Sequence, residues 1–183
     1  GRALLKWRED EDLAQAQLLL EEAARLDPEF ADARHALGCL YDLRDNFYGM
    51  VREWSAVLKL DLAAEVTEPL ETREALAHIT ATAEQVLHTL PAEFRGPLRN
   101  VPIVLESRPH PDVVKEGFDP RALGLFEGTE QAHSADFELP VTSPTRIVLF
   151  TANLLASFPE KERLEEEIEV TLLHEIGHYF GLD

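Results

Sequence analysis

The sequence predicts an α+β fold, in which a helical N-terminal region precedes a small domain made of helices and a short mixed sheet. Apolar residues recur at spacings of three and four through the first third of the chain, which is the period of an amphipathic helix. Short segments rich in β-branched residues follow, and a long helical pattern closes the chain. We expect the two regions to comprise residues 1–64 and 65–183.

The charge balance restricts the class of partner. The 183 residues include 17 Lys and Arg against 35 Asp and Glu, for a formal net charge of -18. Nucleic-acid binding depends on Lys and Arg that neutralise phosphates, so no nucleic-acid partner is expected. A basic peptide or a cation suits this charge better. Apolar runs fall far short of the roughly 20 residues of a membrane helix, so no membrane partner is expected either.

Cysteine usage bears on the compartment. Cys39 is the single cysteine, so no intramolecular disulfide can form, which suits a reducing compartment. No signal peptide is visible at the N-terminus, and a cytoplasmic location is therefore expected. The chain begins at Gly1 within a repeat pattern, so we expect its natural N-terminus to lie further upstream.

The first region contains an internal repeat with a period of about 34 residues. The second helix of each copy carries the residues Ala16, Leu20, Ala23 and Pro28, and then Met50, Trp54, Val57 and Leu62. The first helix of the second copy carries Leu37, Gly38 and Tyr41. The pattern resembles the tetratricopeptide family over about residues 1–64, and the resemblance implies helical hairpins able to bind a partner protein. Core packing is the role expected for Leu37, Tyr41, Trp54 and Leu58, with a partner interface as the alternative.

The second region reads as helix, strands and helix. A helix is expected from Leu70 to Leu90, entered at Thr67 or Glu68 with Pro69 in its first turn. The expected strands are 101–105, which suits a sheet edge because of Pro102, then 123–126 and 146–150. The stretches 107–120 and 129–144 are expected to be ordered loops. The last helix is expected at 160–180, and Gly181 supplies its stop.

The segment from His174 to His178 carries the chemistry. On a helix, His174 and His178 lie one turn apart on the same face, where both imidazoles can bind one zinc ion. Glu175 follows the first histidine and can reach a metal-bound water as a general base without being a ligand. Apolar neighbours such as Leu172 and Ile176 lead us to expect that at least one of the two histidines is buried. The other histidines show no ligand spacing and are read as structural or solvent-facing: His35, His78, His88, His110 and His133.

Residues 174–181 read HExxHxxG, and the chain from about Leu70 to Asp183 resembles the minimal zincin-like metallopeptidases of bacteria. The likeness includes the segments 90–95, 123–128 and 146–150. The resemblance implies a compact zincin half-domain with Zn²⁺ held by two histidines and an aspartate in the pattern HExxHxxGxxD. The aspartate position falls one residue beyond Asp183. The third ligand is thus Asp183, a residue past the end of this chain, or absent.

Two functions follow as hypotheses. In the first, the chain is a zinc-dependent metallopeptidase that hydrolyses peptide bonds in a peptide or protein substrate. An extended substrate is then expected to pair with an edge strand containing Arg146, Ile147, Val148 and Leu149. In the second, the helical repeats form a protein-interaction module that carries an inactive or structural zincin-like domain.

Overall fold

The computed structural model describes residues 2–128 and 145–182, with side chains from residue 12 onward. The chain divides into two compact units, one of residues 1–69 and 109–120 and the other of residues 70–108 and 121–183. The expected boundary after residue 64 lies inside a helix that runs to Thr67, because no Gly or Pro interrupts the chain between residues 50 and 68. The segment 109–120 belongs to the first unit although it lies far along the sequence.

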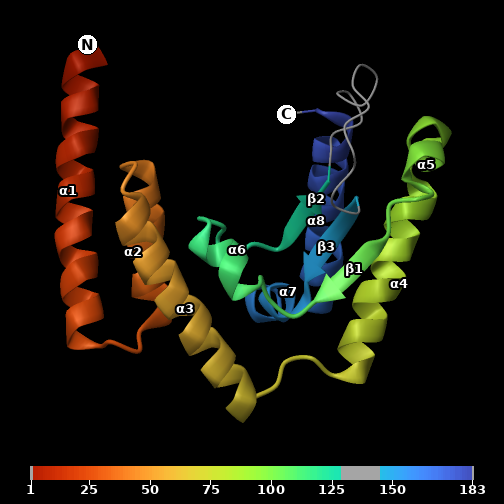
Figure 1. Ribbon diagram of the computed structural model, residues 1–183, viewed down its shortest axis with the longest axis horizontal. Coiled ribbons are helices and arrows are strands. Elements are labelled where there is room, and N and C mark those ends of the chain that lie inside the picture. The colour runs from red at the N-terminus through yellow and green to blue at the C-terminus, as the bar shows by residue number, and fades with distance from the viewer. Residues whose placement is uncertain (1, 129–144, 183) are drawn as a thin grey trace. The chain divides into compact units, whose positions relative to one another are not determined.

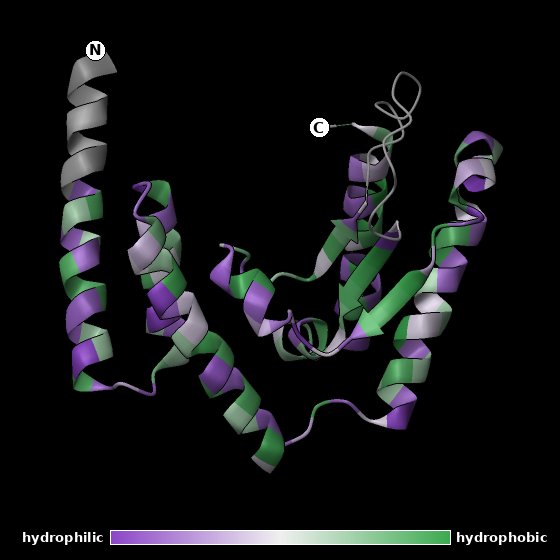
Figure 2. Ribbon diagram, viewed as in Figure 1, coloured by the Kyte–Doolittle hydropathy of each residue, from purple (hydrophilic) through white to green (hydrophobic). Residues whose placement is uncertain are grey.

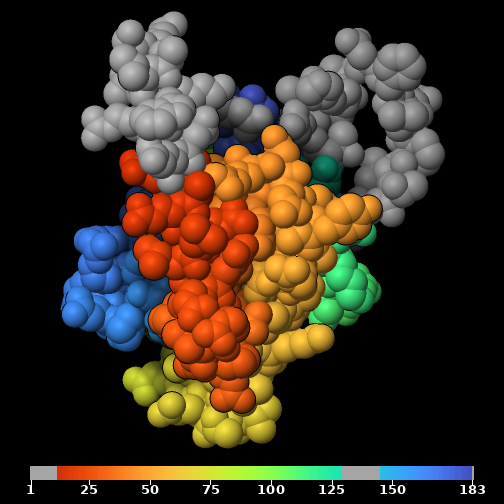
Figure 3. All heavy atoms as spheres, turned by 90° about the vertical axis from the view of Figure 1, so that its left-hand side faces the viewer, coloured from red at the N-terminus to blue at the C-terminus, as the bar shows by residue number. Residues whose placement is uncertain are grey.

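The first unit is helical, as predicted. It contains α1 (Arg2–Leu26), α2 (Ala31–Leu43), α3 (Phe47–Thr67) and the short α6 (Pro111–Lys115). Helices α2 and α3 lie side by side (Figure 1), and the space-filling view of Figure 3 looks onto α1 and α2. The core between these helices consists of Leu37, Tyr41, Met50, Trp54, Leu58 and Val114. Core packing was the role expected for four of these residues, and their burial confirms it.

Gly38 allows α2 and α3 to approach each other. A Cβ atom at this position would lie 2.3 Å from both Cδ1 and Nε1 of the Trp54 indole, which is 5% exposed. No real Cβ contact is that short, so the buried indole would have to move. The glycine of the repeat pattern is therefore required by the packing of one particular side chain.

We expect the substitution Gly38→Ala to lower the free energy of unfolding by roughly 1–3 kcal/mol, the usual cost of overpacking a core. Urea denaturation followed by circular dichroism measures the change. Gly96→Ala is the matched control, because Gly96 is also helical and a Cβ there meets no atom within 4 Å. The control should be neutral or slightly stabilising. A Gly38→Ala chain as stable as the parent would show that Trp54 does not depend on this close approach.

The second unit combines helices with a mixed sheet. Its helices are α4 (Arg73–Thr89), α5 (Ala92–Leu98), α7 (Thr151–Ser157) and α8 (Lys161–Phe180), and its strands are β1 (Ile103–Glu106), β2 (Gly124–Glu127) and β3 (Arg146–Phe150). Within the described residues the strand order is β1-β3-β2, with β1 parallel and β2 antiparallel to β3. The predicted strands and the predicted mixed sheet are confirmed, with shifts of one or two residues at their ends.

Helix α8 contacts both β2 and β3, and it also packs against α4. Figure 1 shows α8 running behind the sheet, and Figure 2 shows that β1 and β3 are strongly hydrophobic. The core residues that α8 contributes are Leu164, Ile168, Leu172 and Ile176, at spacings of four. Together with Ile79, Ala83 and Val86 of α4 they fix the rotation of α8 about its axis.

Local signals explain where the observed elements differ from the expected ones. Helix α4 begins after Thr72, whose hydroxyl accepts a hydrogen bond from the Ala75 amide, so the helix entry expected at Thr67 or Glu68 was wrong. The stretch 107–120, expected to be a loop, contains α6, whose first residue is Pro111 and whose N-cap is His110. The loop expected at 129–144 lies outside the described residues.

Within the described helices, no stretch combines the length and the apolar character that crossing a bilayer requires.

Candidate metal centre

Helix α8 presents the three residues of the sequence motif near its C-terminal end. One face of α8 is buried against the sheet and α4. His174 and His178 lie beside this face, where His174 is exposed and His178 is partly exposed. The expectation that one of the two histidines is buried was therefore wrong. Leu172 and Ile176 occupy the buried face of α8, so the two imidazoles lie outside the core.

The two imidazoles converge. Their Nε2 atoms lie 3.0 Å apart, and the ring centroids are 4.5 Å apart with an interplanar angle of 79°. Two nitrogen ligands of a tetrahedral zinc ion, each about 2.05 Å from the metal, lie about 3.3 Å apart. The His174 and His178 nitrogens are thus close to the separation that one zinc ion requires. Without a metal, a proton on one nitrogen can occupy the same gap in a hydrogen bond between the rings.

Glu175 lies on the adjoining buried side of α8, against β2, with 7% of its surface exposed. Gly124 of β2 makes room for it, because a Cβ there would lie 3.1 Å from Glu175 Cγ and 2.7 Å from Thr171 Cγ2. The Phe126 amide of β2 donates a hydrogen bond to the carboxylate. Burial raises the pKa of Glu175, while His174, His178 and the Phe126 amide act in the opposite direction. The carboxyl group is thereby suited to accept a proton.

This raised pKa predicts a pH-dependent stability of the zinc-free chain. A carboxyl whose pKa is higher in the folded state favours folding while it is protonated and loses that contribution as the pH rises from 4.5 through the folded-state pKa. Glu175→Gln removes the buried charge, so we expect it to raise the free energy of unfolding at pH 7 by roughly 1 kcal/mol and to have little effect at pH 4. Denaturant titrations at both pH values measure this difference.

The control for this pH dependence is Glu169→Gln, which removes an exposed carboxylate from the same helix. It should leave the stability difference between pH 7 and pH 4 unchanged. A Glu175→Gln chain that is less stable than the parent at pH 7 would contradict the cost assigned to burying this carboxylate.

The end of α8 follows the predicted stop. Gly181 has φ 66°, its amide bonds to the His178 carbonyl, and the Leu182 amide bonds to the Gly177 carbonyl. This is the Schellman arrangement, in which glycine adopts the left-handed conformation at low cost. Asp183, the first candidate for a third ligand, lies outside the described residues. Among the described side chains, no third His, Cys, Asp or Glu ligand atom lies within 4.8 Å of both histidine nitrogens.

The edge strand expected for substrate binding is the central strand of the described sheet. β3 pairs with β1 on one side and with β2 on the other, so its backbone hydrogen-bonding groups are already used. Ile147, Val148 and Leu149 are at most 1% exposed, and the Arg146 guanidinium pairs with Glu106 and Glu127 at the neighbouring strands. The expectation that Arg146, Ile147, Val148 and Leu149 form an edge strand is therefore wrong.

The structure also brings together a group that the sequence reasoning missed. His35, Cys39 and Asp119 of the first unit place ligand-type atoms within 4.8 Å of one another. The four-residue spacing of His35 and Cys39 was a visible signal, because it places both residues on one face of a helix. Asp119 had no such signal, since it is 84 residues from His35 in the sequence.

A comparison with known proteins finds a family similarity in the C-terminal part of the chain. No curated protein matches the chain. The family model for zincin-like metallopeptidases matches residues 98–183, which include the sheet and all of α8. The chain is therefore similar to that family over its C-terminal, zincin-like domain.

Proposed function

We propose that this protein is a zinc-dependent metallopeptidase that hydrolyses peptide bonds, with His174 and His178 as metal ligands and Glu175 as general base. The observation that carries the proposal is the convergence of the two Nε2 atoms to 3.0 Å, next to a buried glutamate on the same helix. The family similarity over residues 98–183 supports a peptide or protein as substrate. Asp183 is the candidate third ligand within this chain.

Bound between the histidines, zinc would polarise the scissile carbonyl and lower the pKa of a coordinated water. Residues of the chain bind the metal and transfer the proton. His174 and His178 bind as neutral imidazoles, so acid should release the metal. The Glu175 carboxylate accepts a proton from the attacking water and delivers it to the leaving amine. Its burial against β2 holds the carboxylate in one place and raises its basicity.

Among the described strands, β2 is the edge next to Glu175. The amide of Phe150 donates a hydrogen bond to the carbonyl of Leu123, which makes these two residues a hydrogen-bonded pair of the antiparallel ladder. Such pairs alternate with pairs that are not hydrogen-bonded, so Gly124 and Phe126 direct their N–H and C=O groups away from β3. The Phe126 amide already points to Glu175 on that side. An extended peptide that added to this side of β2 would bring its backbone close to the proposed general base.

The proposal is tested by digesting a peptide library with the zinc-loaded chain, with the chain after chelation, and with the chelated chain after zinc is restored. The library should contain basic peptides, because the net charge of -18 favours them. Cleavage that disappears with the metal and returns with it is the expected result. Two results would contradict the proposal: cleavage that survives complete zinc removal, or no cleavage by a chain that has zinc bound at α8.

A second candidate is a tetratricopeptide-like interaction module with an inactive or structural zinc site. The observation in its favour is a set of exposed apolar side chains on α1–α3: Leu18, Leu19, Leu43, Tyr48 and Val66. Such residues are suited to contact another protein or further helical repeats. The two candidates differ at Glu175, since a peptidase requires this carboxylate and a structural site tolerates its loss.

A further inference from the structure

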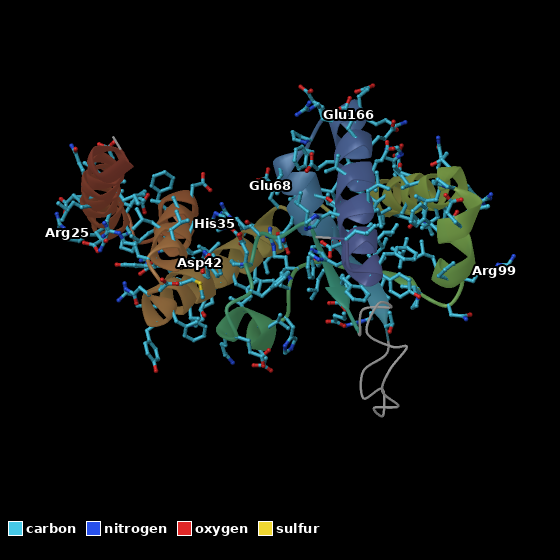
Figure 4. All side chains as sticks on the ribbon, turned by 90° about the horizontal axis from the view of Figure 1, so that it is seen from above. Arg25, His35, Asp42, Glu68, Arg99 and Glu166 are labelled. Carbon is cyan, nitrogen blue, oxygen red and sulfur yellow. The ribbon has the colours of Figure 1, made fainter. Side chains whose placement is uncertain are left out.

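A second group of metal-ligand side chains lies in the first unit, and it is independent of the α8 site. His35 and Cys39 lie one turn apart on α2, and Asp119 follows α6. One ligand atom from each residue lies within 4.8 Å of the other two, and His35 Nε2 is 2.8 Å from Asp119 Oδ1. Figure 4 shows His35 projecting from α2. All three residues are half-buried.

The fold of the first unit, rather than the cluster itself, sets the position of Asp119. Val114 of α6 is fully buried in the core formed with α2 and α3. After α6 the chain turns at Gly117, which has φ 99°, and the Phe118 amide bonds back to the Val113 carbonyl. This turn brings Asp119 next to His35 and Cys39. The three donors therefore meet because of the packing of α6 and not because a ligand holds them together.

The surroundings of the cluster resemble the outer shell of a metal site. The Trp54 indole stacks on His35, with ring centroids 6.4 Å apart, and is itself buried. Its N–H has no well-formed hydrogen bond among the described residues. Burial raises the pKa of the Cys39 thiol, and the neighbouring Trp54 side chain acts in the opposite direction. An N–H donor of this kind stabilises a metal-bound thiolate, while the flat ring restricts the imidazole orientation.

We propose that His35, Cys39 and Asp119 form a second divalent-metal site, and that zinc is its ligand. Imidazole nitrogen, thiolate sulfur and carboxylate oxygen are the three donor types that zinc takes in proteins, and three protein ligands leave one of four tetrahedral positions for water. The metal would replace the proton that His35 and Asp119 share at 2.8 Å. It would thereby fasten the segment 109–120 to α2, across 84 residues of sequence.

The single cysteine makes the test specific. Cobalt(II) bound to a thiolate gives a sulfur-to-metal charge-transfer absorption, and Cys39 is the only thiol that can produce it in this chain. The titration uses the full chain carrying His174→Ala and His178→Ala, so that the α8 site does not compete. We expect one cobalt ion per chain with the charge-transfer band, and we expect zinc to displace it.

Three variants assign the ligands in the same background. Cys39→Ser should abolish the band, while His35→Ala and Asp119→Asn should each weaken cobalt binding at least about tenfold. The matched controls are His88→Ala and Asp112→Asn, which remove an exposed histidine and an exposed carboxylate outside the cluster. Both controls should bind cobalt as the background chain does. Circular dichroism verifies that each variant is folded.

A measurement on the unaltered protein does not depend on any variant folding. Zinc should protect Cys39 from alkylation by iodoacetamide, and a chelator should restore the reaction. Two results would overturn the proposal: a thiol alkylated equally fast with and without zinc, or a charge-transfer band that keeps its affinity in both His35→Ala and Asp119→Asn. The second result would mean that cobalt binds the thiol alone.

Discussion

Glu175→Gln is expected to retain zinc and to lose peptidase turnover by about 10²- to 10⁴-fold, the usual contribution of a general base. Glutamine has nearly the same shape and can still accept the hydrogen bond from the Phe126 amide. It cannot accept a proton from water. The substitution therefore removes the proton transfer and leaves the packing between α8 and β2 in place. Turnover of a library-selected peptide and zinc content by elemental analysis measure the two effects.

The control for turnover is Glu169→Gln, on the exposed side of the same helix. This variant should cleave the peptide at the rate of the parent chain. If Glu175→Gln holds zinc and cleaves as fast as the parent, Glu175 is not the base, and the structural-site candidate gains support.

His178→Ala is expected to weaken zinc binding at α8 by at least about 100-fold, because loss of even an outer-shell partner costs 10- to 100-fold. The described side chains offer no third ligand atom near the pair, so His174 would be left as the one described ligand. The measurement is calorimetry in a Cys39→Ser background, where the site proposed at α2 is disabled. One zinc ion should bind before the histidine is removed.

His88→Ala in the same background is the matched control, since it removes an exposed histidine from α4. Its zinc isotherm should equal that of the background chain. Equal zinc affinity in the His178→Ala chain would place the metal elsewhere.

The sequence was most informative where a local pattern determines the outcome. The spacing of His174 and His178 predicts their convergence because the helix is regular between them, and the left-handed conformation of Gly181 follows from its lack of a Cβ. The predicted strands were right because β-branched runs between turn residues form strands in most contexts. In each case the decisive residues lie within one or two turns of one another.

Errors arose where the outcome depends on distant residues. An apolar run such as Ile147–Leu149 has the same sequence whether it is central or at an edge, and only pairing with β1 and β2 decides between them. The exposure of His174 depends on which side of α8 the sheet and α4 cover. Asp119 reaches His35 through the buried position of Val114, which no local pattern reveals.

The proposed peptidase requires one zinc ion between His174 and His178. Anomalous diffraction at the zinc absorption edge, from crystals of the zinc-loaded protein, tests for an ion at this position. We expect an anomalous peak about 2.0–2.1 Å from the Nε2 atom of each histidine, and the density around it would identify the third ligand. Ordered imidazoles with no peak between them, at a zinc concentration that saturates the chain in solution, would contradict it.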